Sequence, residues 1–245
     1  MTSEAAATPI PRKGRIWVIL ALALALTAVG YAIVDIATKA PGGDVVRVDG
    51  IATAQELFGG VPQEGERLGS ADAPVSIQVF ADMQCGSCRA DFLGTIPALA
   101  NRYARPGDAK LLIRHYSVAQ NPLELGFFGA EAAAEQGYGW QYTYLFFRNQ
   151  DEAERFGVGE EFMDSLAGAI GNLDVPEWEQ YLEDNSGSGG AITTKLEGYD
   201  RLGTDLGIRT RPAMIVSGPD GTRTLQDGPS LADIERAIAE VGGKS

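Results

Sequence analysis

The chain has 245 residues, of which 44% are hydrophobic and 22% are charged, so it can bury the core of one sizeable domain. Acidic residues outnumber Lys and Arg by 33 to 20, and the net charge of −13 argues against binding to nucleic-acid phosphates. Two cysteines, Cys85 and Cys88, are too few for a disulfide-stapled scaffold. With His115 as the single histidine, one chain cannot complete a zinc site of Cys₄ or Cys₂His₂ type.

The N-terminal region carries an uncharged run over residues 16–34, which as a helix would span about 28 Å, close to the hydrocarbon thickness of a bilayer. Positive charge gathers just before it, at Arg12, Lys13 and Arg15. Such charge marks the cytoplasmic side of a membrane segment. We therefore predict a cytoplasmic tail over 1–15, a single transmembrane anchor over 16–38 and the rest of the chain outside the cytoplasm.

A cleaved signal peptide is the alternative interpretation of this region. The apolar run exceeds the usual apolar core of about 7–15 residues, and Ala37 to Ala40 forms a poor cleavage site. A buried core helix fits less well, because no polar face interrupts the run. Both membrane-targeting interpretations place the folded part in an oxidising compartment.

The rest of the chain is predicted to form a linker followed by a domain. Glycines and prolines over 39–67 predict the linker, with a short helix near 53–58, and the domain is expected over 68–245. Alternating apolar residues predict a strand over 75–81, and 110–116 reads as a second strand. A helix over 86–103 joins them, with a kink expected at Pro97 and an apolar face of Phe92, Ile96, Leu99 and Tyr103. Strand, helix and strand in this order predict a parallel pair with a right-handed crossover.

Residues of about 120–206 are expected to form a helical insertion. After it, residues 213–217 and 222–225 predict a β-hairpin, turned at Pro219 to Gly221. Ser230 is expected to cap a last amphipathic helix. The predicted fold class is α/β, in the thioredoxin order with a helical insertion.

The sequence Cys85-Gly-Ser-Cys88 follows the first predicted strand and opens the next helix. A spacing of three lets two sulfur atoms meet across one helical turn. The first cysteine lies where unpaired N–H groups and the helix dipole favour an anion, so the pKa of its thiol is expected to be low. The thiolate is both the attacking and the leaving species in disulfide exchange, and Gly86 leaves room for a partner polypeptide. The pair therefore predicts redox activity.

Three other interpretations of the pair stay open. A metal half-site would need further soft ligands from a second chain. A structural disulfide closing so small a loop would contribute little chain entropy. Inert buried thiols fit poorly with a position between a strand and a helix.

Several segments together resemble the DsbA-like branch of the thioredoxin superfamily, in particular its membrane-anchored bacterial members. They are 68–75, the stretch Phe80-Ala-Asp-Met-Gln-Cys-Gly-Ser-Cys88, residues 136–140 and Gly207-Ile-Arg-Thr-Arg-Pro212. The resemblance covers about residues 55–242. It implies that Cys85 is the exposed nucleophile, that Cys88 is the buried resolving thiol, and that Pro212 is a cis-proline facing them. It also implies that a substrate chain pairs with the backbone at Arg211 and Pro212. The alternative for Pro212 is a trans proline that starts a strand.

The sequence departs from the family pattern at three places. Gly-Ser replaces the Pro-His of strongly oxidising members, which predicts a weaker oxidant. Val79 stands where many relatives carry a buried acid, a role that Gln78 or a water molecule would have to fill. Arg211 replaces a threonine or valine; its guanidinium would favour the Cys85 thiolate if it lies close, and the alternative is a solvated side chain pointing away.

We therefore predict an extracytoplasmic thiol–disulfide oxidoreductase that exchanges disulfides with exported proteins and is reset by a membrane redox partner. His115 is interpreted as structural, Asp82 as ending a loop near the site, and neither an organic cofactor nor a resident metal is expected. Two alternatives belong to other classes. One is a non-catalytic adaptor that binds extended peptides near Pro212, and the other is a protein that handles a soft metal ion with its two thiolates.

Overall fold

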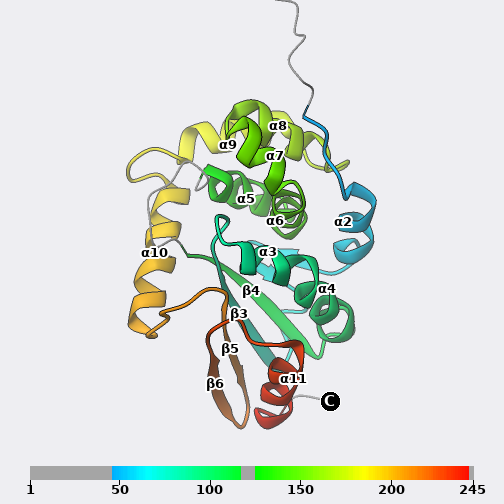
Figure 1. Ribbon diagram of the computed structural model, residues 1–245, viewed down its shortest axis with the longest axis vertical. Helices are drawn as coiled ribbons and strands as arrows, with labels where there is room; N and C mark the ends of the chain where they lie inside the picture. Colours follow the sequence, from blue (N-terminus) through cyan, green and yellow to red (C-terminus); the bar gives the residue numbers. More distant parts are fainter. Residues whose placement is uncertain (1–45, 117–124, 243–245) are drawn as a thin grey trace, which may run out of the picture. The chain divides into compact units, whose positions relative to one another are not determined.

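The computed structural model describes residues 46–116 and 125–242 (Figure 1). The predicted tail and anchor, residues 1–38, lie outside this part of the chain, as does the linker up to residue 45. In the described ranges, no helix combines the length and apolar character that crossing a bilayer requires.

The compact unit begins at Val46, so the predicted boundary at residue 68 is wrong for 46–67. Helix α2 (Ile51–Phe58) buries Phe58 completely against Trp140, with ring centroids 6.3 Å apart. Strands β1 (Gln63–Glu64) and β2 (Arg67–Leu68) then join the sheet. The glycines that suggested a flexible tether instead form turns between these short elements; Gly65, for example, has a φ of 54° between β1 and β2.

A six-stranded sheet with the order β1-β2-β4-β3-β5-β6 forms the centre of the unit. Strand β3 (Val75–Ala81) runs parallel to β4 (Ala109–His115) and antiparallel to β5 (Ala213–Gly218), which forms a hairpin with β6 (Gly221–Leu225). The predicted parallel crossover and the C-terminal hairpin are thereby confirmed.

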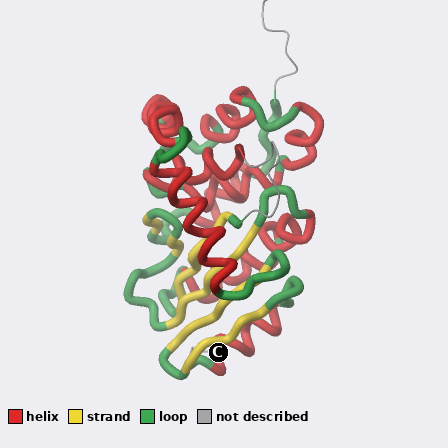
Figure 2. Tube along the Cα trace, turned by 90° about the vertical axis from the view of Figure 1, so that its left-hand side faces the viewer, coloured by secondary structure: helices red, strands yellow, loops and turns green. Residues whose placement is uncertain are grey.

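Helices cover both faces of this sheet (Figures 1 and 2). On one face, Val75, Ile77 and Val79 are fully buried in the main core. This core includes residues of α3 (Gly86–Leu93), α4 (Thr95–Leu99) and α11 (Leu231–Glu240). On the other face, Phe80 joins a smaller cluster to which Leu202 of α10 contributes. Figure 2 shows α10 (Ala191–Asp205) crossing this second face.

The crossover is three helical pieces rather than one kinked helix: α3 (Gly86–Leu93), α4 (Thr95–Leu99) and a π-helical turn, η1 (Ala100–Ala104). The expected kink at Pro97 is wrong, because the break falls at Gly94. Pro97 lies in the first turn of α4, where a backbone N–H has no partner within the helix, so proline is tolerated there. The expected apolar face is confirmed, since all four of its residues are buried.

The insertion is helical, as predicted, over the residues that the structure describes. Its helices are α5 (Leu125–Glu135), α6 (Gly139–Arg148), α7 (Gln150–Phe156), α8 (Glu160–Gly168), α9 (Val175–Asn185) and α10. The aromatic residues of α6 fill the core beneath α3; Phe147 stacks on Phe92 with centroids 4.7 Å apart. The last helix, α11 (Leu231–Glu240), begins with a capping box between Ser230 and Asp233.

Candidate active site

The turn between β3 and α3 places Cys85 at the start of a helix. The Asp82 carbonyl accepts a hydrogen bond from the Cys85 N–H at 3.1 Å, and the Asp82 carboxylate accepts one from the Gln84 N–H at 2.9 Å. Cys85 is the N-cap of α3, and its sulfur accepts a hydrogen bond from the Cys88 N–H at 3.1 Å. A Cβ atom added to Gly86 would meet no atom within 4 Å, so the space beside Gly86 is free of other protein atoms.

The two thiols differ in exposure and acidity. Cys85 is half-buried, whereas Cys88 is fully buried. A hydrogen bond from the Cys88 thiol is the largest of the effects that lower the pKa of Cys85 to about 6; burial opposes it, and the Ser87 hydroxyl and the Cys88 N–H add to it. The pKa of Cys88 is raised, first by the hydrogen bond that its thiol donates to Cys85 and then by burial. Near neutral pH, Cys85 is therefore expected as a thiolate and Cys88 as a protonated thiol.

The Arg211–Pro212 peptide bond is cis, as the resemblance implies, and it faces the motif. The Arg211 carbonyl oxygen lies 3.7 Å from the Cys85 sulfur and 3.4 Å from the Ser87 hydroxyl oxygen, and it accepts from both groups when Cys85 is protonated. The backbone before Pro212 therefore lies directly against the nucleophilic sulfur.

The Arg211 side chain neither stabilises the Cys85 thiolate nor extends into solvent, which were the two expected arrangements. It does not point into solvent, because only 23% of it is exposed, and its ionic partner is Asp82 rather than Cys85. Its Nη1 atom lies 3.5 Å from Asp82 Oδ2, and the guanidinium carbon lies 5.9 Å from the centroid of the Tyr116 ring. The guanidinium thus balances an acid of the active-site turn.

Gln78 does not take the place of a buried acid beside Cys88. Because side chains alternate along a strand, Gln78 lies on the opposite face of β3 from Val79, and its amide oxygen accepts from Arg114 at 3.1 Å. The acid that the structure brings to Cys88 is Asp82, which is 4% exposed and whose N–H lies 3.5 Å from the Cys88 sulfur. Asp82 opens the turn after β3 rather than ending a loop, and the sequence pattern did not indicate its burial.

Helix α7 of the insertion contacts both the active-site turn and helix α3. The buried Gln150 amide donates to the Met83 carbonyl at 2.9 Å. Asp151 pairs with Arg89, the residue after Cys88, through two contacts of 2.5 and 2.9 Å. Sequence reasoning missed these contacts, since nothing in a stretch of charged residues shows which distant loop it will meet.

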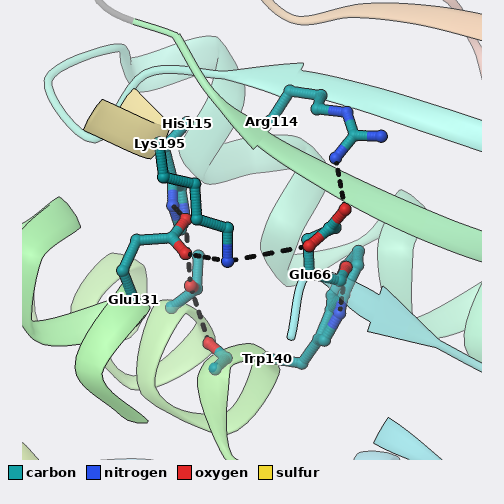
Figure 3. A network of polar contacts seen from close by, with 8 residues as sticks. Glu66, Arg114, His115, Glu131, Trp140 and Lys195 are labelled. Carbon is teal, nitrogen blue, oxygen red and sulfur yellow. Dashed lines mark hydrogen bonds and ion pairs between the residues drawn. The ribbon is translucent and has the colours of Figure 1, made fainter. Parts of the chain in front are cut away.

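His115 lies in a buried polar network, in agreement with its structural interpretation (Figure 3). Its Nδ1 atom is 2.8 Å from Glu131 Oε1, and Glu131 also pairs with Lys195 at 2.7 Å. Lys195 and Arg114 both pair with Glu66. This network joins strand β4, the segment before β2 and helices α5 and α10. The Cys85 sulfur is not part of it and contacts Ser87, Cys88 and Arg211 instead.

Comparison with known proteins identifies the class. The family model described as Thioredoxin matches residues 63–197, which is more than half of the chain, so the protein belongs to this family. The "Probable disulfide bond formation protein D" of Bacillus cereus is 23% identical over 166 residues, which cover 66% of this chain and 74% of that protein. Within the family, the resemblance to DsbA-like protein disulfide oxidoreductases is therefore confirmed.

Solved structures agree on the fold. Oxidised BdbD from Bacillus subtilis superposes with a TM-score of 0.61 at 18% identity, covering 74% of this chain and 96% of that one. The α-DsbA1 protein from Wolbachia pipientis gives a TM-score of 0.59 at 16% identity, covering 77% of this chain and 95% of that one. The thioredoxin-like fold with a helical insertion is thus the fold of this protein.

Proposed function

We propose that this DsbA-like oxidoreductase exchanges disulfides with exported proteins through Cys85 and Cys88. The observation that carries the proposal is the difference between the two thiols: a half-exposed Cys85 with a pKa of about 6 lies one helical turn before a fully buried Cys88. A disulfide between two such residues is attacked at the exposed sulfur, and the buried sulfur is reserved for the internal step.

The exchange proceeds in two displacements. A substrate thiolate attacks Cys85 Sγ, the Cys85–Cys88 bond breaks, and a mixed disulfide forms while Cys88 leaves with the electron pair. A second substrate thiolate then attacks the substrate sulfur of the mixed disulfide and releases Cys85 as a thiolate. The substrate has lost two electrons and the protein has gained them. The reverse sequence reduces or isomerises substrate disulfides with the same residues.

The backbone at Arg211 and Pro212 is proposed to receive the substrate chain. The Arg211 carbonyl already lies 3.7 Å from the Cys85 sulfur, so a peptide joined to Cys85 would pass along this segment. An extended chain can pair there through main-chain hydrogen bonds, which would allow many substrate sequences.

Trapping the mixed disulfide tests the exchange. A Cys88→Ser variant cannot resolve the intermediate, so it should accumulate Cys85-linked substrate protein, whereas Cys85→Ser should trap none. Mass spectrometry of the wild-type protein across glutathione buffers should show the loss of two hydrogens as the pair oxidises. A potential near −270 mV would indicate reduction and one near −120 mV oxidation. Full cellular activity of Cys85→Ser would instead favour the peptide-binding adaptor.

The location is proposed from the sequence alone. Residues 16–38 are proposed to anchor the protein in the cell membrane, with the thioredoxin-like domain outside the cytoplasm, where a membrane redox partner resets the cysteine pair. Protease added to intact cells stripped of their wall should then digest the domain, and a chain lacking residues 1–38 should leave the membrane fraction. Recovery of the full-length chain in the cytoplasmic fraction would contradict this part of the proposal.

A further inference from the structure

A buried carboxylate lies beside the resolving thiol, on the turn that forms the active site. Asp82 is 4% exposed, and its own N–H donates to the Cys88 sulfur at 3.5 Å. The charge of its carboxylate raises the pKa of Cys88, so the carboxyl group lies close enough to act on this thiol. In the part of the chain that the structure describes, no other carboxylate is among the groups that shift the pKa of Cys88.

The surroundings of Asp82 suit a group that gains and loses a proton. Burial raises its pKa, while the hydrogen bond from the Gln84 N–H and the charge of Arg211 act in the opposite direction. The titratable and charged groups that face it are Cys85 and Cys88 from α3 and Arg211 from the segment before β5. A carboxyl group balanced in this way is easier to protonate than an exposed aspartate, yet it retains a cation to stabilise its anion.

We infer that Asp82 exchanges the proton of Cys88 during each catalytic cycle and that Arg211 positions and balances the Asp82 carboxylate. This inference rests on the proposed disulfide exchange and assigns its proton-transfer group. Gln78 cannot fill this role because it lies on the other face of the sheet.

The proton balance follows the two directions of exchange. When substrate thiolate breaks the Cys85–Cys88 bond, Cys88 leaves as a buried thiolate, and the Asp82 carboxylic acid protonates it. The resulting carboxylate pairs with Arg211 and regains a proton from water. In the reverse direction, the Asp82 carboxylate takes the proton from the Cys88 thiol. The Cys88 sulfur then attacks Cys85 Sγ of the mixed disulfide, and the substrate leaves as a thiolate.

The test follows the reverse step in isolation. Reduced protein is converted to a mixed disulfide between Cys85 and glutathione, and the release of glutathione by Cys88 is timed across pH. Asp82→Asn keeps an oxygen that can accept from the Gln84 N–H, so the turn is retained. This variant should release glutathione roughly a hundredfold more slowly near neutral pH, the lower end of what a positioned base contributes. The deficit should shrink as pH rises, because hydroxide then removes the thiol proton.

Asp91→Asn is the matched control. Asp91 lies on the same helix as the cysteines, its carboxyl interacts with Cys85, and burial is the largest cause that raises its pKa to about 6. Its removal should leave the pH dependence of glutathione release as in the wild type. Asp82→Glu should restore part of the rate, which a purely structural role of Asp82 would not produce.

The outcomes separate the inference from the proposed function. If wild type and Asp82→Asn show equal pH profiles, and circular dichroism shows that both proteins are folded, the proton-transfer role is overturned. The proposed disulfide exchange would not be affected by that result. A wild-type protein that never releases glutathione by forming a Cys85–Cys88 disulfide would instead overturn the proposed function. An equal loss in Asp91→Asn would also refute the inference, because it would show a general electrostatic effect.

Discussion

The low pKa of Cys85 predicts that the reduced protein becomes more stable as pH rises. The pKa of this thiol falls from an ordinary 9.0 to about 6 on folding. A group whose folded pKa is depressed contributes stability above its unfolded pKa and loses it as pH falls through the folded value. The window in which stability is lost therefore runs from about 9 down to about 6. A Cys85→Ser variant has no such group and provides the reference.

The magnitude can be estimated from the two pKa values. At about pH 8 they correspond to roughly 3 kcal/mol of stabilisation, and at about pH 5 to almost none. Because Cys85 is partly exposed, solvent screening should reduce the difference to roughly 1 kcal/mol. Urea unfolding of reduced wild type and reduced Cys85→Ser at both pH values measures it. If the free energy of unfolding of wild type relative to the variant stays constant or falls with pH, the assigned thiolate is refuted.

Three further perturbations test the surroundings of the site. Ser87→Ala removes a hydroxyl 3.2 Å from the Cys85 sulfur and should raise the pKa of this thiol by about one unit, measured by thiolate absorbance; an unchanged pKa would contradict the assigned hydrogen bond. Gln150→Leu leaves the Met83 carbonyl without its donor and should lower the free energy of unfolding by about 1–3 kcal/mol. Unfolding like that of wild type would show that α7 does not support the turn. Glu131→Gln removes the buried carboxylate of the network and should cost about 3–5 kcal/mol, yet leave the Cys85 pKa unchanged. A shifted thiol pKa would show that the network reaches the active site.

Much of the fold could be predicted because local sequence patterns determine where its strands and helices form. Alternation over 75–81 located β3, and the order of strand, helix and strand fixed its parallel neighbour. The errors came where tertiary contacts outweighed local composition. Glycines over 59–65 suggested a tether, but the burial of Phe58 against Trp140 draws that segment into the domain. Pro97 suggested a kink, but a proline near the start of a helix disturbs nothing.

The candidate active site likewise combines features that the sequence predicts with features that only the structure shows. The spacing of Cys85 and Cys88 at the start of a helix follows from neighbouring residues, so the sequence sufficed to find it. The partners of these thiols come from distant segments, and their directions depend on the fold. Arg211 is 126 positions from Cys85, and only the structure shows that its carbonyl faces the sulfur while its guanidinium turns to Asp82.

The Gly-Ser dipeptide lacks a histidine donor, and its thiolate is therefore expected to be less stabilised than in members with Pro-His. In this structure the Cys85 sulfur receives hydrogen bonds from the Cys88 thiol, the Cys88 N–H and the Ser87 hydroxyl. These donors are neutral, and the nearby Asp82 carboxylate acts against them by raising the pKa of Cys85. Stabilising the thiolate stabilises the reduced state, so the donors make the protein more oxidising and Asp82 makes it less so. The stability of the Cys85 thiolate therefore depends on Cys88, Ser87 and Asp82 together, rather than on the dipeptide alone.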